Sequence, residues 1–313
     1  MRIDVMEDTC SEAHARPVFR GVWPVAITPF RPDGAIDEAA SCELIDWYVE
    51  KGVHGLFVNC YASEMSELTP EERLAITRSA VECAAGRIGV VSTGSFGETL
   101  DEHAEFAKRV AGCGVDAVIL TPPAFCRDDD DDLLSYFLEM AARVPCMLGI
   151  YECPTPSPKK LLPVAMVAQL AESGRYGPFK ETSCDIDTIR RKVEVSAGSP
   201  LAVLQASSPL LPDAMAAGTP GFMGPGATVA PELAVRIVRN VEAGVDVGRD
   251  HQLLCLTNSL ITHGYWPAMK FILGMRGLSL GYTCRAESTG AFESYQLIVE
   301  KGWALLEDEI VRS

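Results

Sequence analysis

The strongest constraint on the fold is a pattern that repeats from residue 22 onward, in which a short apolar run is followed by a stretch with helical periodicity. Units of this kind, about 20 to 35 residues long, are typical of βα units that build a parallel sheet. The glycine-rich fingerprint of an open dinucleotide-binding sheet is missing, so the strict alternation favours a closed (β/α)8 TIM barrel. The expected strands are residues 22–28, 55–59, 88–93, 116–121, 146–151, 177–180, 202–205 and 221–223.

Local signals refine these elements and divide the chain. Pro24 weakens the first expected strand, because proline removes a hydrogen-bond donor. Capping boxes at Thr69 and Thr99 mark the starts of two helices. Beyond residue 230 the strand pattern stops, and helical runs at 231–243, 251–261, 266–275 and 286–307 predict a C-terminal helical extension. We therefore expect an irregular N-terminal extension at 1–17, the barrel at 18–230 and a C-terminal helical domain at 231–313.

Composition limits the partners. The net charge of −16 argues against nucleic acid and anionic lipid, which are bound by clustered Lys and Arg. No apolar run approaches the roughly 20 residues that cross a bilayer, and the start lacks the apolar stretch of a signal peptide. We expect a cytoplasmic protein with no membrane contact. The 11 cysteines form no C-x-x-C pair and the histidines are isolated, so we expect reduced thiols, no metal site and no cofactor.

Lys180 is the most informative residue for function, because it ends an apolar run. Burial there would lower the pKa of its ammonium group from about 10.4 towards the range in which the free amine attacks a carbonyl. That is the chemistry of a Schiff-base enzyme. The alternative is a buried lysine paired with a carboxylate such as Glu181. Most other lysines sit among charged or turn residues and are expected to be solvated: Lys51, Lys108, Lys159, Lys160, Lys192 and Lys301.

Tyr151 ends the strand before that of Lys180. In a (β/α)8 barrel the reacting groups come from the C-terminal ends of strands, so Tyr151 and Lys180 should meet at the barrel mouth. A phenol beside a Schiff-base nitrogen can relay protons, whereas Tyr151 taken alone fits an amphipathic core residue equally well. Lys270 also follows apolar neighbours, but it lies on an expected helix of the tail, and we interpret it as structural.

Several motifs across residues 20–280 resemble the dihydrodipicolinate synthase and N-acetylneuraminate lyase superfamily of Schiff-base aldolases and lyases. They follow the family's order and spacing: GVWPVAITPF, DGAIDEAA, CYASEMSELTPEER, TPPAF, YECP, FKETSCD and PAMKFILGMRGL. The resemblance implies that Lys180 is the Schiff-base lysine and Tyr151 the catalytic tyrosine. It also implies a homo-oligomer, since family members usually assemble as dimers or tetramers.

The chain departs from the family where the pyruvate carboxylate is held. The hydroxyl-rich run before the family's glutamate reads Cys60-Tyr-Ala-Ser-Glu64 here. Tyr61 matches the relay threonine and can supply a hydroxyl, so it is a third catalytic candidate. Backbone N–H groups can bind a carboxylate whatever the side chain, which makes Ala62 and Ser63 candidate substrate contacts.

Further departures concern the second half of the pocket. Pro123 and Ala124 replace a tyrosine pair that includes a relay tyrosine, and Pro156 replaces the arginine that binds the second substrate's carboxylate. These changes argue against lysine biosynthesis and sialic acid cleavage. They favour an uncharged or aromatic aldehyde, or a sugar-acid derivative held by other groups. The remaining candidate substrate contacts are Thr182, Ser207 and Met223, although the two hydroxyl residues also suit helix caps.

The sequence therefore predicts a Schiff-base-forming lyase or aldolase that acts on pyruvate or a related 2-oxo acid, with an imine on Lys180 and Tyr151 as proton relay. One alternative is a dehydratase of a 2-keto-3-deoxy sugar acid, which uses the same imine but expels water. The other is a barrel that binds a 2-oxo acid without turnover, because the hydroxyls after the second strand are lost.

Overall fold

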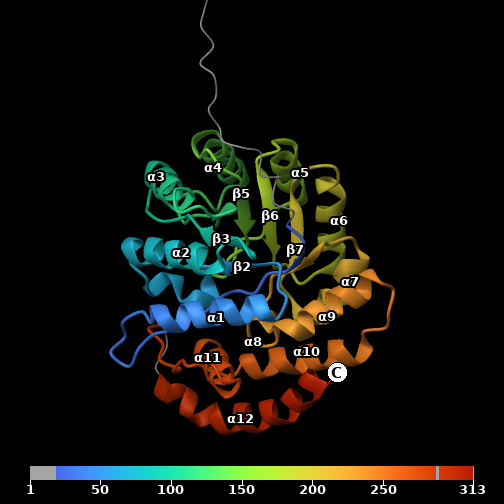
Figure 1. The fold of residues 1–313 in the computed structure, drawn as a ribbon. Helices are drawn as coiled ribbons and strands as arrows, with labels where there is room; N and C mark the ends of the chain where they lie inside the picture. The colour runs from blue at the N-terminus through green and yellow to red at the C-terminus, as the bar shows by residue number, and fades with distance from the viewer. Residues whose placement is uncertain (1–18, 287–288, 313) are drawn as a thin grey trace, which may run out of the picture.

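A closed parallel barrel forms the centre of the molecule (Figure 1). The structure is a computed structural model that describes residues 19–286 and 289–312, so the predicted irregular segment at 1–17 lies outside the described residues. The strands are hydrogen-bonded in the order β1-β8-β7-β6-β5-β4-β3-β2, and a bridge between Val25 and Phe57 joins the two ends of that order. The (β/α)8 barrel prediction is confirmed. The strands are β1 (Gly21–Val22), β2 (Gly55–Val58), β3 (Gly89–Thr93), β4 (Ala117–Leu120), β5 (Leu148–Tyr151), β6 (Tyr176–Glu181), β7 (Ala202–Gln205) and β8 (Gly221–Phe222).

The first strand is shorter than the sequence predicted. β1 pairs with β8 at only two positions, and then the chain changes partner: the Trp23 N–H donates to the Phe222 carbonyl, but the Ala26 N–H donates to that of Phe57. Pro24 lies at this change and has no N–H to donate. The seam also requires glycine, because a Cβ at Gly221 would lie 2.0 Å from the Gly21 carbonyl oxygen.

Helices surround the barrel and extend it on one side (Figure 1). Capping boxes at Thr69 and Thr99 start α2 and α3, as predicted. α9 packs against β1 and β8, where the helix after the eighth strand belongs, and α12 packs on α10 and α11. The division into domains at residue 230 stays a prediction. The helices are α1 (Glu38–Glu50), α2 (Pro70–Ala84), α3 (Leu100–Ala111), α4 (Asp130–Arg143), α5 (Val164–Glu172), α6 (Ile186–Ser196), α7 (Leu211–Ala216), α8 (Gly226–Val229), α9 (Pro231–Glu242), α10 (Gly248–Ile261), α11 (Trp266–Met275) and α12 (Thr289–Arg312).

Two cysteines do not fit the prediction of reduced thiols. Cys42 in α1 and Cys83 in α2 form a disulfide, with their Cα atoms 5.5 Å apart. The prediction was wrong for this pair because α1 and α2 are neighbours around the barrel, and packing brings together residues that are 41 positions apart in the sequence.

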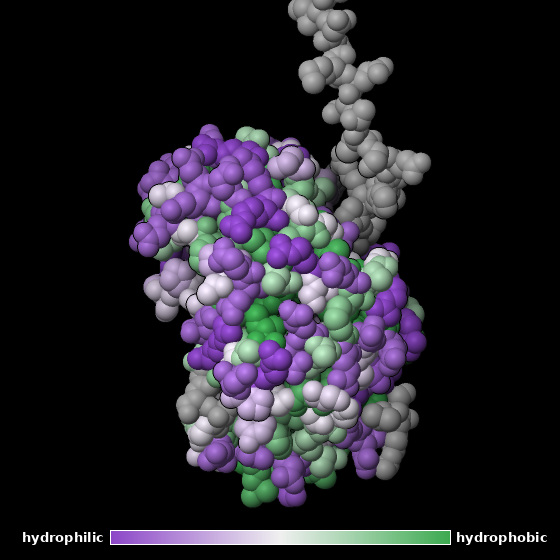
Figure 2. Space-filling model, turned by 60° about the vertical axis from the view of Figure 1, so that its left-hand side comes forward, coloured by the Kyte–Doolittle hydropathy of each residue, from purple (hydrophilic) through white to green (hydrophobic). Residues whose placement is uncertain are grey.

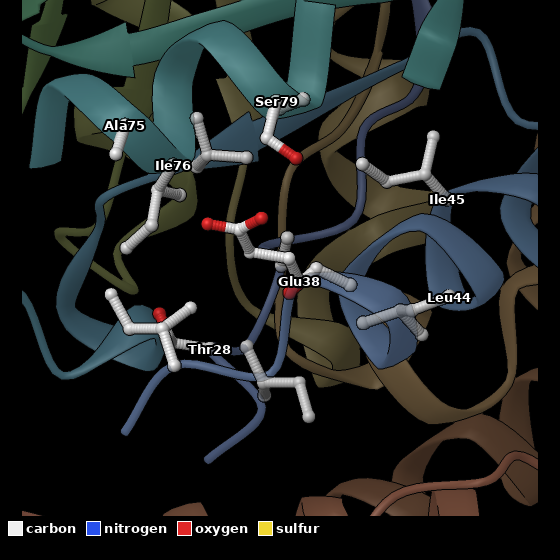
Figure 3. Close-up of a pocket in the computed structure, with 13 residues that line it drawn as sticks. Thr28, Glu38, Leu44, Ile45, Ala75, Ile76 and Ser79 are labelled. Atoms are coloured by element: carbon white, nitrogen blue, oxygen red, sulfur yellow. The ribbon is translucent and has the colours of Figure 1, made fainter. Parts of the chain in front are cut away.

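Figure 3 shows a small cavity near this disulfide, where the Glu38 carboxylate points towards Ser79 among aliphatic side chains such as Ile45 and Ile76. Its volume of about 40 Å³ has room for only a few water molecules. It is also separate from the strand ends that carry Lys180 and Tyr151, so it is not a substrate site.

Figure 2 shows hydrophilic residues over most of the face in view, with smaller hydrophobic areas between them. In the described residues, no helix is both long and apolar enough to span a bilayer. Within the same ranges, no group of three or more His, Cys, Asp or Glu side chains is placed to hold a metal ion.

Candidate active site

Tyr151 and Lys180 lie side by side at the C-terminal ends of β5 and β6. They are register partners in the parallel pair, and both side chains are buried, with 3% and 4% of their surface exposed. The Lys180 Nζ lies 4.3 Å from the centroid of the Tyr151 ring and 5.5 Å from that of Phe57. The Phe57 ring packs edge-on against Tyr151 and fixes its plane. The structure thus brings together the two residues on which the sequence-based hypothesis depends.

The surroundings of Lys180 favour its uncharged form. No carboxylate among the described residues forms an ion pair with its Nζ, and Glu181 turns instead to Lys192. Burial lowers the pKa of Lys180 from its ordinary value, and the nearby Cys60 and Cys153 thiols act weakly in the opposite direction. The alternative of a buried Lys180–Glu181 pair therefore does not hold.

Tyr151 is suited to donate a proton, because its phenol stays protonated. Burial raises the pKa of its phenol well above the ordinary value, and Cys153, Tyr265 and Cys60 raise it further. The phenol therefore keeps its proton at neutral pH. A protonated phenol next to an uncharged amine is the arrangement that imine chemistry needs.

A pocket of about 340 Å³ opens above these two residues. Three predicted residues, Tyr61, Thr182 and Ser207, line it. The Thr182 hydroxyl donates to the Glu152 carbonyl, and the Ser207 N–H donates to the Gln205 side-chain oxygen. These bonds fix the loops after β6 and β7 around the pocket.

Ala62, Ser63 and Met223 are not among the residues that line this pocket. Residues Tyr61–Ser63 form a 3-10 turn that directs the Ser63 hydroxyl inward, where it donates to the Ala26 carbonyl at 2.5 Å. The Ser63 N–H donates to the Cys60 carbonyl, so it is not directed at a ligand. Met223 is fully buried in the barrel core. These three residues therefore lie outside the pocket lining.

Sequence reasoning missed the pocket residues from the helical extension. Asn258 in α10 and Tyr265, immediately before α11, both line the pocket. The Tyr61 ring packs against Tyr265 and Trp266, with centroids 5.5 and 5.0 Å apart, and the Trp266 indole N–H donates to the Tyr61 carbonyl. The aromatic cluster Tyr265-Trp266 was the available signal. Lys159 and Cys184, on the loops after β5 and β6, were also missed.

A buried ion pair holds the extension in place. The Lys270 Nζ donates to Glu64 Oε1 at 2.5 Å, and both side chains are fully buried. Glu64 Oε2 accepts the N–H groups of Arg285 and Ala286. In agreement with the structural role expected for Lys270, this link joins the turn that carries Tyr61 to the helix that follows Tyr265.

A barrel with a buried lysine amine and a tyrosine at its mouth defines an enzyme of the class I aldolase or lyase type. Residues 18–302 match the model of the Dihydrodipicolinate synthetase family, and this span shows that the chain belongs to that family.

Two relatives and one solved structure show how similar the chain is to other proteins in sequence and in fold. The chain is 29% identical over 221 residues to the 4-hydroxy-tetrahydrodipicolinate synthase of Methanothrix thermoacetophila, covering 71% of this chain and 74% of that protein. It is 26% identical over 264 residues to an uncharacterized DapA-like lyase of Halobacterium salinarum, covering 83% and 86%. The crystal structure of the E. coli K12 prophage protein YagE in complex with pyruvate superposes with a TM-score of 0.82 at 23% identity, covering 91% of this chain and 99% of that chain. That likeness shows the shared fold.

Proposed function

We propose that the protein is a Schiff-base-forming lyase or aldolase that acts on pyruvate or a related 2-oxo acid, with Lys180 as the nucleophile and Tyr151 as the proton relay. One observation carries this proposal: the Lys180 amine is buried without a carboxylate partner among the described residues, and lies 4.3 Å from the Tyr151 ring. The pyruvate bound by the related structure supports the choice of substrate class.

In the proposed reaction, the Lys180 amine attacks the keto carbon of the 2-oxo acid. Tyr151 gives its proton to the carbonyl oxygen, and the attacking nitrogen returns a proton to the Tyr151 oxygen. Tyr151 then protonates the hydroxyl, which leaves as water and produces the protonated imine. Loss of a proton from C3 converts the protonated imine into an enamine. The enamine carbon then attacks an aldehyde, or the reverse sequence cleaves the carbon–carbon bond. Tyr61 remains a candidate for assisting these transfers.

The outer pocket supports a hydroxylated second substrate. Ser207 and Asn258 line it with hydroxyl and amide groups, and the buried Ser208 hydroxyl donates to the Asn258 side-chain oxygen. Such groups suit the hydroxyls of a sugar-acid derivative. This observation also supports the second candidate, a 2-keto-3-deoxy sugar acid dehydratase. Binding of a 2-oxo acid without turnover is the third candidate.

Chemical trapping tests the proposal. Incubation with pyruvate and borohydride should reduce the imine to a stable amine on Lys180, located by mass spectrometry of the digested protein. Exposed lysines such as Lys301 give the background in the same digest. An unmodified Lys180 would exclude both enzyme candidates. Release of an aldehyde rather than loss of water, across a panel of 2-oxo acids, would separate lyase from dehydratase.

The pH dependence of imine formation should follow the lowered pKa of Lys180. Only the free amine attacks, so the rate should rise with pH and level off at a pH below the ordinary pKa of 10.5. Tyr151 should not contribute to this limb, because its pKa lies well above 10.0 and its phenol stays protonated. The measurement is the initial rate of trapping with cyanoborohydride between pH 6 and pH 11. A limb centred at or above 10.5 would contradict the proposed environment of the amine.

The oligomeric state, expected to be a dimer or tetramer, stays a prediction, as does the cytoplasmic location. Size-exclusion chromatography with light scattering would measure the first.

A further inference from the structure

Tyr265 reaches the pocket from an unusual backbone conformation. Its φ of 52° and ψ of −85° place a non-glycine residue on the left-handed side, which is uncommon and is found preferentially at functional sites. Hydrogen bonds hold this conformation on both sides: its N–H donates to the Ile261 carbonyl, and its carbonyl accepts from the Met269 N–H. The backbone between α10 and α11 thus fixes the direction of one tyrosine side chain.

Neighbouring rings fix the side chain as well. Tyr265 packs against Tyr61 at 5.5 Å and edge-on against Trp266 at 5.5 Å, and Trp266 is tied to the Tyr61 carbonyl. Tyr265 lines the same pocket as Lys180 and Tyr151, and it is half-buried rather than sealed. A half-buried phenol in the lining of this pocket can reach a molecule bound there.

The proposed reaction needs a second proton carrier. Tyr151 is almost completely buried, and once it has given up its proton it needs one from a neighbouring group. The Tyr265 phenol lines the same pocket and is among the groups that raise the pKa of Tyr151. The two phenols are therefore electrostatically coupled. Pro123 and Ala124, in the loop after β4, line a different pocket and carry no ionisable group.

We infer that Tyr265 is a catalytic residue: its hydroxyl is the second member of the proton relay, and it takes the C3 proton of the bound 2-oxo acid. The inference rests on the proposed function.

As the carbon–oxygen bond of the carbinolamine breaks, Tyr151 gives its proton to the departing hydroxyl, which leaves as water. Tyr265 then gives its proton to the Tyr151 oxygen. The Tyr265 oxygen takes the proton from C3 of the imine, the C3–H electron pair forms the carbon–carbon double bond, and the imine electrons move to nitrogen. Both phenols are restored and the enamine is formed.

Exchange of the pyruvate methyl protons in D2O, followed by NMR, tests this step. In Tyr265→Phe the ring packing is kept, so the Lys180 adduct should still form on long incubation with borohydride. Methyl exchange should fall by about 100-fold or more, the usual effect of losing a general acid–base group. The matched control is Tyr295→Phe, at a tyrosine on α12 that is 44% exposed, and it should exchange at the wild-type rate.

The other results would contradict either the relay role of Tyr265 or the proposed function. Exchange in Tyr265→Phe within threefold of wild type would overturn the relay role, as would loss of exchange in Tyr61→Phe alone. A wild-type protein that forms the Lys180 adduct without any methyl exchange would overturn the relay role but keep the imine site. A wild-type protein without the adduct would overturn the proposed function itself.

A second substitution tests the inference even if the Tyr265→Phe variant does not fold. Replacing Tyr265 with 3-fluorotyrosine keeps the ring and lowers the pKa of its phenol. If Tyr265 transfers the proton, the pH profile of methyl exchange should move to lower pH. An unchanged profile would show that Tyr265 only packs against Tyr61, and the inference would be wrong.

Discussion

Replacing Lys180 with methionine should abolish imine formation and lower kcat/KM by about 10⁴-fold or more, because the nucleophile of a covalent mechanism is lost. Methionine has a similar length and suits the apolar surroundings provided by Phe57 and Tyr151. The measurement is borohydride trapping with pyruvate, combined with steady-state kinetics on whichever 2-oxo acid is turned over.

The same variant should fold at least as stably as the wild type at pH 7. The pKa of Lys180 is lower in the folded protein than in the unfolded chain, so the unfolded chain binds this proton more tightly. Below the unfolded pKa the buried amine therefore costs stability, and methionine removes that cost. The matched control is Lys301→Met at an exposed lysine, which should change neither kinetics nor stability. Residual turnover in Lys180→Met, or an adduct on another lysine, would contradict the assignment.

The residues at the strand ends could be predicted because their signal is local. Tyr151 and Lys180 each close an apolar run, and alternation along a parallel barrel brings such ends to one face. The fold was predictable for the same reason. The first strand was overestimated most, since the run at residues 22–28 does not reveal where the chain changes its bonding partner from β8 to β2.

Tyr265 and Asn258 could not be predicted, because their place depends on long-range packing. The ion pair that docks the extension joins Glu64 and Lys270, which are 206 residues apart, and no local pattern predicts that contact. The predicted substrate contact at Ser63 stays a prediction, and in the structure the Ser63 N–H donates to the Cys60 carbonyl. The Ser63 hydroxyl is used by the Ala26 carbonyl, from a segment 37 residues earlier.

The prediction that Lys192 is solvated was wrong. The charged residues around it in the sequence predict an exposed position. In the structure the buried residues of α6 are Ile189, Lys192 and Ser196, which also follow helical spacing. Lys192 faces inward because two carboxylates there require a cation. Its Nζ donates to Glu152 Oε1 at 2.6 Å and to Glu181 Oε1 at 3.1 Å, and all three side chains are fully buried.

This triad supports the site directly. Glu152 follows Tyr151 and Glu181 follows Lys180, so the two acidic residues adjoin the two reacting groups. Glu152 also accepts the N–H groups of Leu162 and Thr182, which fixes the loops after β5 and β6. A change at Lys192 should therefore affect both stability and the position of the amine.

Lys192→Met should lower the free energy of unfolding by about 3–5 kcal/mol, because removal of one partner leaves buried charge uncompensated. Burial already raises the pKa of Glu152, and Lys192 is the main group that opposes this. Without Lys192 the pKa of Glu152 rises further, so the folded state binds more protons than the unfolded chain between the unfolded and folded pKa values. The free energy of unfolding of Lys192→Met then falls as pH rises through that window. Its loss of stability relative to wild type should therefore be smaller at pH 5 than at pH 7.

Urea unfolding followed by circular dichroism at both pH values measures the effect. The double variant Glu152→Gln with Lys192→Met removes one of the stranded charges and should recover part of the lost stability, whereas Glu300→Gln at an exposed position is a neutral control. Recovery of stability together with the trapping rate at Lys180 would show that the triad acts by positioning the strand ends. If Lys192→Met unfolds within about 1 kcal/mol of wild type, as surface substitutions do, the buried triad is not the support described here.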